Sequence, residues 1–247
     1  MNASISQPVR LDRATKWGPL SLARATGIFW LGTMVAGLTA VAINTKLVVS
    51  GDAAATAANV LTHASLLQTG FALYLVEMVC QVSFIALFYL LLKPAGNRIS
   101  LLAAFIGLTA AIIKTFSRLF FIAPLFVLGG DHYLNVFTTG QLHAFALLFF
   151  KINNHGAALA LVFFGFYGIL QGYLTIRSTF LPKFLGVLSI LYSLGLLCFL
   201  YPPLGYRLFV PYVGALALVS VAAWIFWLLV FGVNEQRWSE QANATAT

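Results

Sequence analysis

The stretch Leu67–Leu92 reads LQTGFALYLVEMVCQVSFIALFYLLL, and it decides the fold because it is long and apolar enough to cross a bilayer. A transmembrane helix needs about 20 mostly apolar residues. A second stretch of this kind, Ile99–Leu128, follows after only six residues, Lys93–Arg98. Pro94 and Gly96 in that linker are typical of a tight turn. The two stretches therefore predict a hairpin of two transmembrane helices.

The rest of the chain has the same character on both sides of this hairpin. Of its 247 residues, 61% are hydrophobic and only 8% are charged, whereas a typical soluble domain has about 25% charged residues. Four more apolar stretches have the length of a span: Ala25–Leu47, His155–Ile176, Phe184–Tyr201 and Leu208–Val233. We therefore predict an all-α polytopic membrane protein, built as a bundle of six transmembrane helices.

The spans divide the chain into three parts. Residues 23–233 are expected to form the transmembrane domain, and residues 1–22 a polar cytoplasmic segment before it. The polar residues 234–247 are expected to form a cytoplasmic tail without ordered structure. Ser50–His63, which is rich in Ala and Thr, is interpreted as a loop between the first two spans.

One segment, Tyr133–Phe150, is ambiguous. Its uninterrupted apolar core, Ala144–Phe150, is too short to span a bilayer. It is followed by the polar run Lys151–His155, which we interpret as a break before the next helix. We therefore predict one interfacial helix here in addition to the six spans. The alternative is a seventh span.

The basic residues favour six spans with both termini in the cytoplasm. Cytoplasmic loops of membrane proteins carry an excess of Lys and Arg. The six-span topology places nine basic residues inside and three outside, whereas seven spans give eight against four. The same rule explains the net charge of +8, so we predict no nucleic-acid partner.

Three charged residues lie inside the predicted hairpin: Glu77, Lys114 and Arg118. A charge in the middle of a bilayer costs about 2.5–3.5 kcal/mol on insertion scales, so such residues face the protein interior and pair. Glu77 and Lys114 are each 18.5 positions from the centre of the turn between Ala95 and Gly96. They are therefore predicted to lie at the same depth and to pair, with Arg118 one helical turn from Lys114.

This cluster has one carboxylate for two cations, which leaves a formal charge of +1. Lys114 is neutral, or Arg118 extends toward the interface, or an anionic group completes the site. The cluster is then either a buried ion pair that fixes the register of the helices or a binding or transport site. An anionic or amphipathic small molecule is the ligand that its charge predicts.

Other polar residues are weaker candidates for the same ligand. Gln81 lies on the helix face of Glu77. Tyr167 and Gln171 are separated by four positions and share one face of the fourth span. The four histidines have no HxxxH or HExxH spacing, and a metal needs ligands that converge. We therefore predict no metal site and no cofactor.

The second half of the chain carries an ordered set of motifs. Leu161-Val-Phe-Phe-Gly165 precedes Gln171-Gly-Tyr-Leu-Thr-Ile-Arg-Ser178, which is followed by Phe180-Leu-Pro-Lys-Phe-Leu-Gly-Val-Leu188. In these motifs the chain resembles the domain of unknown function 4386 family, whose members carry a "VFFG…GYL…RS…PxxLGVL" pattern. The resemblance implies a multi-pass protein of the bacterial plasma membrane, and it implies no catalytic residue.

Three classes of function remain open from the sequence. We favour a non-enzymatic membrane protein that binds or moves a small or amphipathic molecule at the charged cluster. The alternatives are a membrane-embedded enzyme acting on a lipid or quinone, and a structural or accessory subunit without a ligand. The lipid bilayer is the one partner that the composition predicts, and the sequence predicts no oligomeric state.

Overall fold

The computed structural model describes residues 18–245, apart from the side chain of residue 210, and these residues form helices and turns without a strand. Six helices are long and apolar enough to cross a membrane, which confirms the predicted all-α multi-pass fold. They are α1 (Pro19–Leu47), α3 (Ala64–Leu92), α4 (Asn97–Leu128), α5 (Thr139–Arg177), α6 (Lys183–Leu196, continued by the 3-10 turn Leu197–Leu200) and α8 (Gly214–Val230). The shorter helices are α2 (Ala53–Thr62), α7 (Pro202–Leu208) and α9 (Glu235–Ala244).

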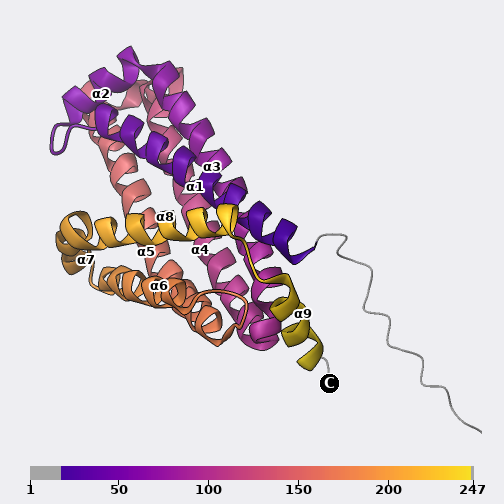
Figure 1. The fold of residues 1–247 in the computed structure, drawn as a ribbon. Helices are drawn as coiled ribbons and strands as arrows, with labels where there is room; N and C mark the ends of the chain where they lie inside the picture. Colours follow the sequence, from indigo (N-terminus) through magenta and orange to yellow (C-terminus); the bar gives the residue numbers. More distant parts are fainter. Residues whose placement is uncertain (1–17, 246–247) are drawn as a thin grey trace, which may run out of the picture.

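The long helices α1, α3, α4 and α5 run along the length of the molecule, and the shorter α6 and α8 lie against them (Figure 1). The neighbours in contact are α1 with α3, α3 with α4, α4 with α5, α5 with α6, and α8 with both α1 and α6. Helix α2 lies at one end of the bundle and α9 at the other. We call these the α2 end and the α9 end.

The two ends of the described chain meet at the α9 end. The backbone N–H of Leu20, in the first turn of α1, donates to Oε1 of Glu235 in α9 at 3.2 Å. This neighbourhood is the result expected for an even number of membrane crossings, because each crossing reverses the side on which the chain emerges.

Local sequence explains where several helices begin. Pro19 starts α1, where its missing N–H has no partner to lose. The Asp52 side chain accepts from the N–H of Ala55 at 2.9 Å and caps α2. Thr138 and Gln141 form a reciprocal capping box at the start of α5. These caps satisfy N–H groups that a helix start otherwise leaves without partners.

Aromatic side chains form the centre of the core. Trp30 of α1 stacks on Phe84 of α3 with ring centroids 5.2 Å apart. Trp224 of α8 lies edge-on to Phe88 of α3 at 5.2 Å. Trp224 also donates from Nε1 to Oγ of Ser189 in α6 at 2.7 Å. One buried aromatic cluster thus joins α1, α3 and α8, and the indole N–H of Trp224 links it to α6.

Helices α5 and α6 approach so closely that their backbones touch at two glycines. A β-carbon placed on Gly172 would lie 2.6 Å from the carbonyl oxygen of Gly186. No other residue fits at this contact without a backbone shift. Small residues at helix interfaces permit such close packing in membranes, so this pair fixes the α5–α6 hairpin.

The structure corrects the prediction for Tyr133–Phe150. We expected an interfacial helix that ends at Lys151–His155, but α5 is one continuous helix of 39 residues. The polar run does not end the helix, because Asn153 is fully buried against neighbouring helices rather than solvated. At 1.5 Å per residue α5 is about 58 Å long, which exceeds the about 40–45 Å of a bilayer with its headgroups.

Three smaller predictions are also corrected. The expected loop Ser50–His63 contains α2, and the expected disordered tail 234–247 contains α9. Trp238 explains the order of α9, because its Nε1 donates to the carbonyl of Leu91 at the end of α3, at 2.9 Å. The first helix begins at Pro19 rather than Ala25, and residues 1–17 lie outside the described residues.

Candidate functional site

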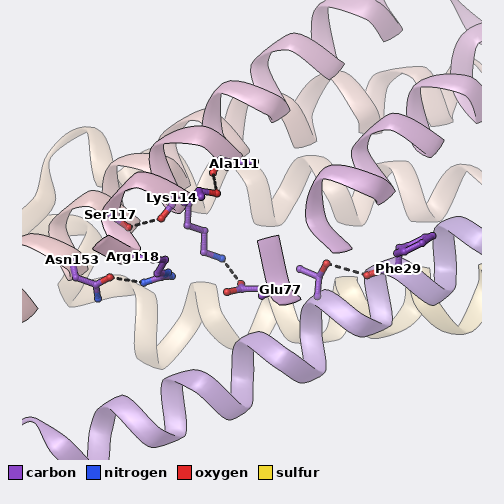
Figure 2. Close-up of polar contacts among 9 residues, drawn as sticks. Phe29, Glu77, Ala111, Lys114, Ser117, Arg118 and Asn153 are labelled. Atoms are coloured by element: carbon purple, nitrogen blue, oxygen red, sulfur yellow. Dashed lines mark hydrogen bonds and ion pairs between the residues drawn. The ribbon is translucent and has the colours of Figure 1, made fainter. Parts of the chain in front are cut away.

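Glu77 and Lys114 form a direct ion pair between α3 and α4, as their equal distance from the turn predicts. The Nζ atom of Lys114 lies 2.5 Å from Oε1 of Glu77. Figure 2 shows the lysine side chain reaching from α4 to the carboxylate on α3. The pair fixes the register of the hairpin, because sliding either helix by one turn would separate the charges by about 5.4 Å.

Helix α1 also packs against the Glu77 carboxylate, at Gly37. A β-carbon on Gly37 would lie 2.7 Å from Oε1 of Glu77, so glycine leaves the space that the carboxylate occupies. Glu77 is only 4% exposed, and its second oxygen, Oε2, is buried without a hydrogen-bond partner. The carboxylate is therefore desolvated on one side and paired on the other.

Arg118 lies beside this pair but is held by neutral groups. Its Nη1 donates to Oδ1 of Asn153 on α5 at 2.9 Å. Its guanidinium carbon lies 3.7 Å from the ring centroid of Tyr74 on α3, a cation–π contact. Arg118 is 4% exposed, and its Nε is buried without a partner. Three helices therefore enclose one cation that has no carboxylate of its own.

The charge imbalance that the sequence predicts is present in the structure. Within residues 18–245, the Glu77–Lys114 contact is the one ion pair. Arg118 contributes a further positive charge in the same cluster (Figure 2). Desolvation of an unpaired charge costs several kcal/mol, and within the cluster no carboxylate offsets this cost for Arg118.

Sequence reasoning missed three residues of this cluster: Gly37, Tyr74 and Asn153. Tyr74 lies three positions before Glu77, so the helical repeat places it on the same face. Asn153 was interpreted as part of a break between helices. An unpaired asparagine inside an apolar helix is costly in a membrane. This cost could have predicted that Asn153 pairs with a polar group on another helix.

Gln81 lies near the cluster but is not bonded to it. It is buried on α3, one turn beyond Glu77 toward the α9 end, and its Oε1 has no hydrogen-bond partner. Gln81 is therefore buried on the same helix as Glu77, in agreement with the shared face that the sequence predicts. A ligand role for Gln81 stays a prediction.

Tyr167 and Gln171 belong to a different part of the bundle. Both are buried on α5, and the Tyr167 ring packs where a β-carbon on Gly107 of α4 would lie. Fourteen positions separate Tyr167 from Asn153, which is about 21 Å along the helix. The Tyr167 hydroxyl and Gln171 Nε2 lack partners, but they are too far from Arg118 to complete its site.

The described residues offer no grouping suited to a metal. Across residues 18–245, no three His, Cys, Asp or Glu side chains lie together in a way that could hold an ion. The chemistry of the site therefore rests on its two cations, its carboxylate and the amide of Asn153.

Six apolar helices around a buried charged cluster define this chain as a multi-pass helical membrane protein. The chain belongs to the family described as "Domain of unknown function (DUF4386)", whose pattern matches residues 25–232. The match covers all six candidate spans except the first turns of α1, and it confirms the resemblance carried by the motifs of α5 and α6. A comparison with curated proteins and one with solved structures found no match.

Proposed function

We propose that this protein binds a small amphipathic anion at the cluster of Glu77, Lys114 and Arg118. The observation that carries the proposal is the buried guanidinium of Arg118, which has no carboxylate partner and whose Nε has no hydrogen-bond partner. A water molecule can accept a hydrogen bond from Nε, but it cannot neutralise the charge. A carboxylate or phosphate does both, and guanidinium groups bind such groups in a fork.

The depth of the cluster favours a ligand with an apolar body. Arg118 lies 21 positions after Asn97, which starts α4 at the α9 end. That separation is about 32 Å along the helix, in the half of the membrane nearer the α2 end. The helix surfaces around the cluster are apolar, so a molecule whose anionic group reaches Arg118 leaves the rest of its body among acyl chains. An acyl or isoprenoid chain tolerates this, and a small hydrophilic ion does not.

A dye-based unfolding assay in a non-ionic detergent tests the proposal with three ligands that share a twelve-carbon chain. Dodecyl phosphate and laurate are anionic, and dodecanol is neutral. We expect the two anions to stabilise the wild type by about 2–3 kcal/mol at a concentration near 100 times their Kd, and dodecanol to stabilise it much less. Arg118→Gln should remove the difference, whereas Arg118→Lys should retain part of it.

The matched control is Arg177→Gln, which removes an exposed arginine at the α9 end. It should respond to the anions as the wild type does. Equal stabilisation by dodecyl phosphate and dodecanol in the wild type would refute the proposal. So would an undiminished response to the anions in Arg118→Gln.

The second candidate is a structural ion pair without a ligand. The close contact of Gly37 with Glu77 favours it, because a carboxylate packed this tightly leaves little room for exchange of partners. In that case Arg118→Gln would leave the difference between the anions and dodecanol as it is in the wild type. The same assay therefore separates the two candidates.

We further propose that the protein lies in the bacterial plasma membrane with the α9 end in the cytoplasm. Among the described residues, the α9 end carries Arg24, Lys93, Arg98, Arg177, Lys183 and Arg237, whereas three basic residues lie toward the opposite ends of the spans (Figure 1): Lys46, Lys151 and, on α7, Arg207. This excess is the pattern of cytoplasmic loops. A reporter that is active only in the cytoplasm should be active when fused after residue 247. An inactive reporter on a stably expressed fusion would show that the C-terminus is not in the cytoplasm and would contradict this orientation.

A further inference from the structure

A groove of about 760 Å³ runs along the surface between α4 and α5. Its walls are almost entirely apolar, and their most exposed members are Ile112 and Phe116 on α4 and Leu148 and Leu159 on α5. Both helices are among the six that are long and apolar enough to cross a membrane. Its shape and composition suit a hydrocarbon chain.

The groove is separate from the charged cluster. Ser117 and Gly156 line it from opposite helices, and they touch, because a β-carbon on Gly156 would lie 2.6 Å from Cβ of Ser117. Arg118 and Asn153 lie behind this contact and are buried. A molecule in the groove therefore meets the wall of the cluster and not its charges.

The polar side chains of the groove are positive or neutral. Lys151 and His155 line it from α5, four positions apart on one helix face. A ring nitrogen of His155 lies 2.9 Å from the carbonyl of Lys151, and since a carbonyl only accepts, that nitrogen donates. Neither Asp nor Glu lines the groove. The exposed ammonium of Lys151 is thus available to an anionic group.

Tyr206 of α7 borders this basic pair. Its ring lies edge-on to His155 with centroids 5.8 Å apart. A tyrosine hydroxyl is neutral at physiological pH, and partial burial raises the pKa of the Tyr206 hydroxyl further. This group therefore does not repel an anion. Tyrosine at such a place is typical of the boundary between hydrocarbon and headgroups.

The positions along α5 place the two parts of the groove at different depths. Lys151 is 26 positions from Arg177, the residue that ends α5 at the α9 end, and Leu159 is 18 positions from it. These separations are about 39 Å and 27 Å along the helix. With a hydrocarbon layer of about 30 Å and headgroup layers on each side, Lys151 reaches the headgroups at the α2 end and Leu159 stays among acyl chains.

From this combination we infer that the groove binds an anionic phospholipid of the leaflet at the α2 end. The phosphate lies at Lys151 beside His155 and Tyr206, and one acyl chain lies along the apolar wall toward Leu159. A zwitterionic lipid offers the same chain, but its cationic headgroup finds no carboxylate in the groove. The preference for net negative charge therefore comes from Lys151.

Native mass spectrometry of the purified protein, titrated with phosphatidylglycerol or phosphatidylcholine of identical chains, tests this inference. The wild type should hold one phosphatidylglycerol more tightly than phosphatidylcholine. A cation near a membrane surface contributes about 1 kcal/mol to binding an anionic lipid, so Lys151→Gln should weaken the binding of phosphatidylglycerol by about fivefold. The binding of phosphatidylcholine should weaken less, because its choline group already balances the charge of its phosphate. Leu159→Trp places a larger side chain in the groove from an exposed position, so it should weaken the binding of both lipids.

Two matched controls keep the test specific. Lys46→Gln removes another exposed lysine at the α2 end, and Leu119→Trp adds the same bulk to an exposed position of α4 outside the groove. Both should bind lipid as the wild type does. Equal loss with Lys46→Gln, or no loss with Lys151→Gln, would overturn the inference. A dimer that Leu159→Trp dissociates would also overturn it, because the groove would then hold a second copy of the chain.

Discussion

The α3–α4 hairpin and the α5–α6 hairpin hold their helices together by different means. In the first, Lys114 and Glu77 form a charged contact 2.5 Å long across two helices. In the second, Gly172 and Gly186 bring the backbones into contact, and the polar bond nearby is the neutral one from Trp224 to Ser189. Lipid chains are as apolar as the helices, so neither hairpin gains much from the hydrophobic effect.

The difference lies in what happens when one partner is lost. A charge that loses its partner in a low-dielectric interior keeps its full cost of desolvation. A neutral donor that loses its partner keeps a smaller cost, and a glycine contact has no polar partner to lose. The charged hairpin is therefore more specific and is destabilised more by the loss of one partner.

The largest effect is expected for Lys114→Met, which leaves the Glu77 carboxylate buried without its cation. We expect a loss of about 3–5 kcal/mol in the free energy of unfolding, measured by titration with a denaturing detergent. Glu77→Gln combined with Lys114→Met should recover much of that loss, since both charges are gone. Purely additive effects of the two substitutions would show that the residues do not interact.

An intermediate effect is expected for Gly172→Ala in the α5–α6 hairpin. The added methyl meets the backbone of Gly186, which cannot rotate away, so the helices must separate. We expect a loss of about 1–3 kcal/mol, the usual cost of overpacking. Gly140→Ala is the matched control, because nothing lies within 4 Å of its β-carbon position. A loss no larger than that of the control would mean that the hairpin tolerates wider packing.

The smallest effect is expected for Ser189→Ala, which leaves Nε1 of Trp224 without an acceptor. Hydrogen bonds between transmembrane helices contribute about 0.6 kcal/mol on average and up to about 1.7 kcal/mol. Ser220→Ala on α8 is the control, because Oγ of Ser220 is equally buried and has no hydrogen-bond partner. A loss for Ser189→Ala as large as that for Lys114→Met would reverse the ranking of charged and neutral contacts.

The sequence predicted the features that depend on length and spacing. Apolar runs of about 20 residues predict membrane spans without any knowledge of the helices that pack against them. The structure contains six helices of this kind among the described residues. Equal spacing from the turn was enough to pair Glu77 with Lys114, because a helical hairpin converts sequence distance directly into depth. These predictions needed no knowledge of which helices pack together.

The predictions that were wrong concern residues whose partners are distant in sequence. Asn153 was interpreted as a break because its partner, Arg118, lies on another helix 35 positions away. The tail was expected to be disordered because Trp238 finds its acceptor at Leu91, 147 positions earlier. Gly37 was not singled out, because only the packing of α1 on α3 gives it a role beside Glu77.

Helix α9 has a consequence for the order of synthesis. It bonds to Leu20 at the start of α1 and to Leu91 at the end of α3, yet it is made more than 200 residues after Leu20. At about 5–20 residues per second the ribosome needs roughly 10–40 s to bridge that interval. Until α9 is made, the N–H of Leu20 and the carbonyl of Leu91 lack these two partners. Translation of the final segment thus adds the last contacts to α1 and α3, which pack against each other without it.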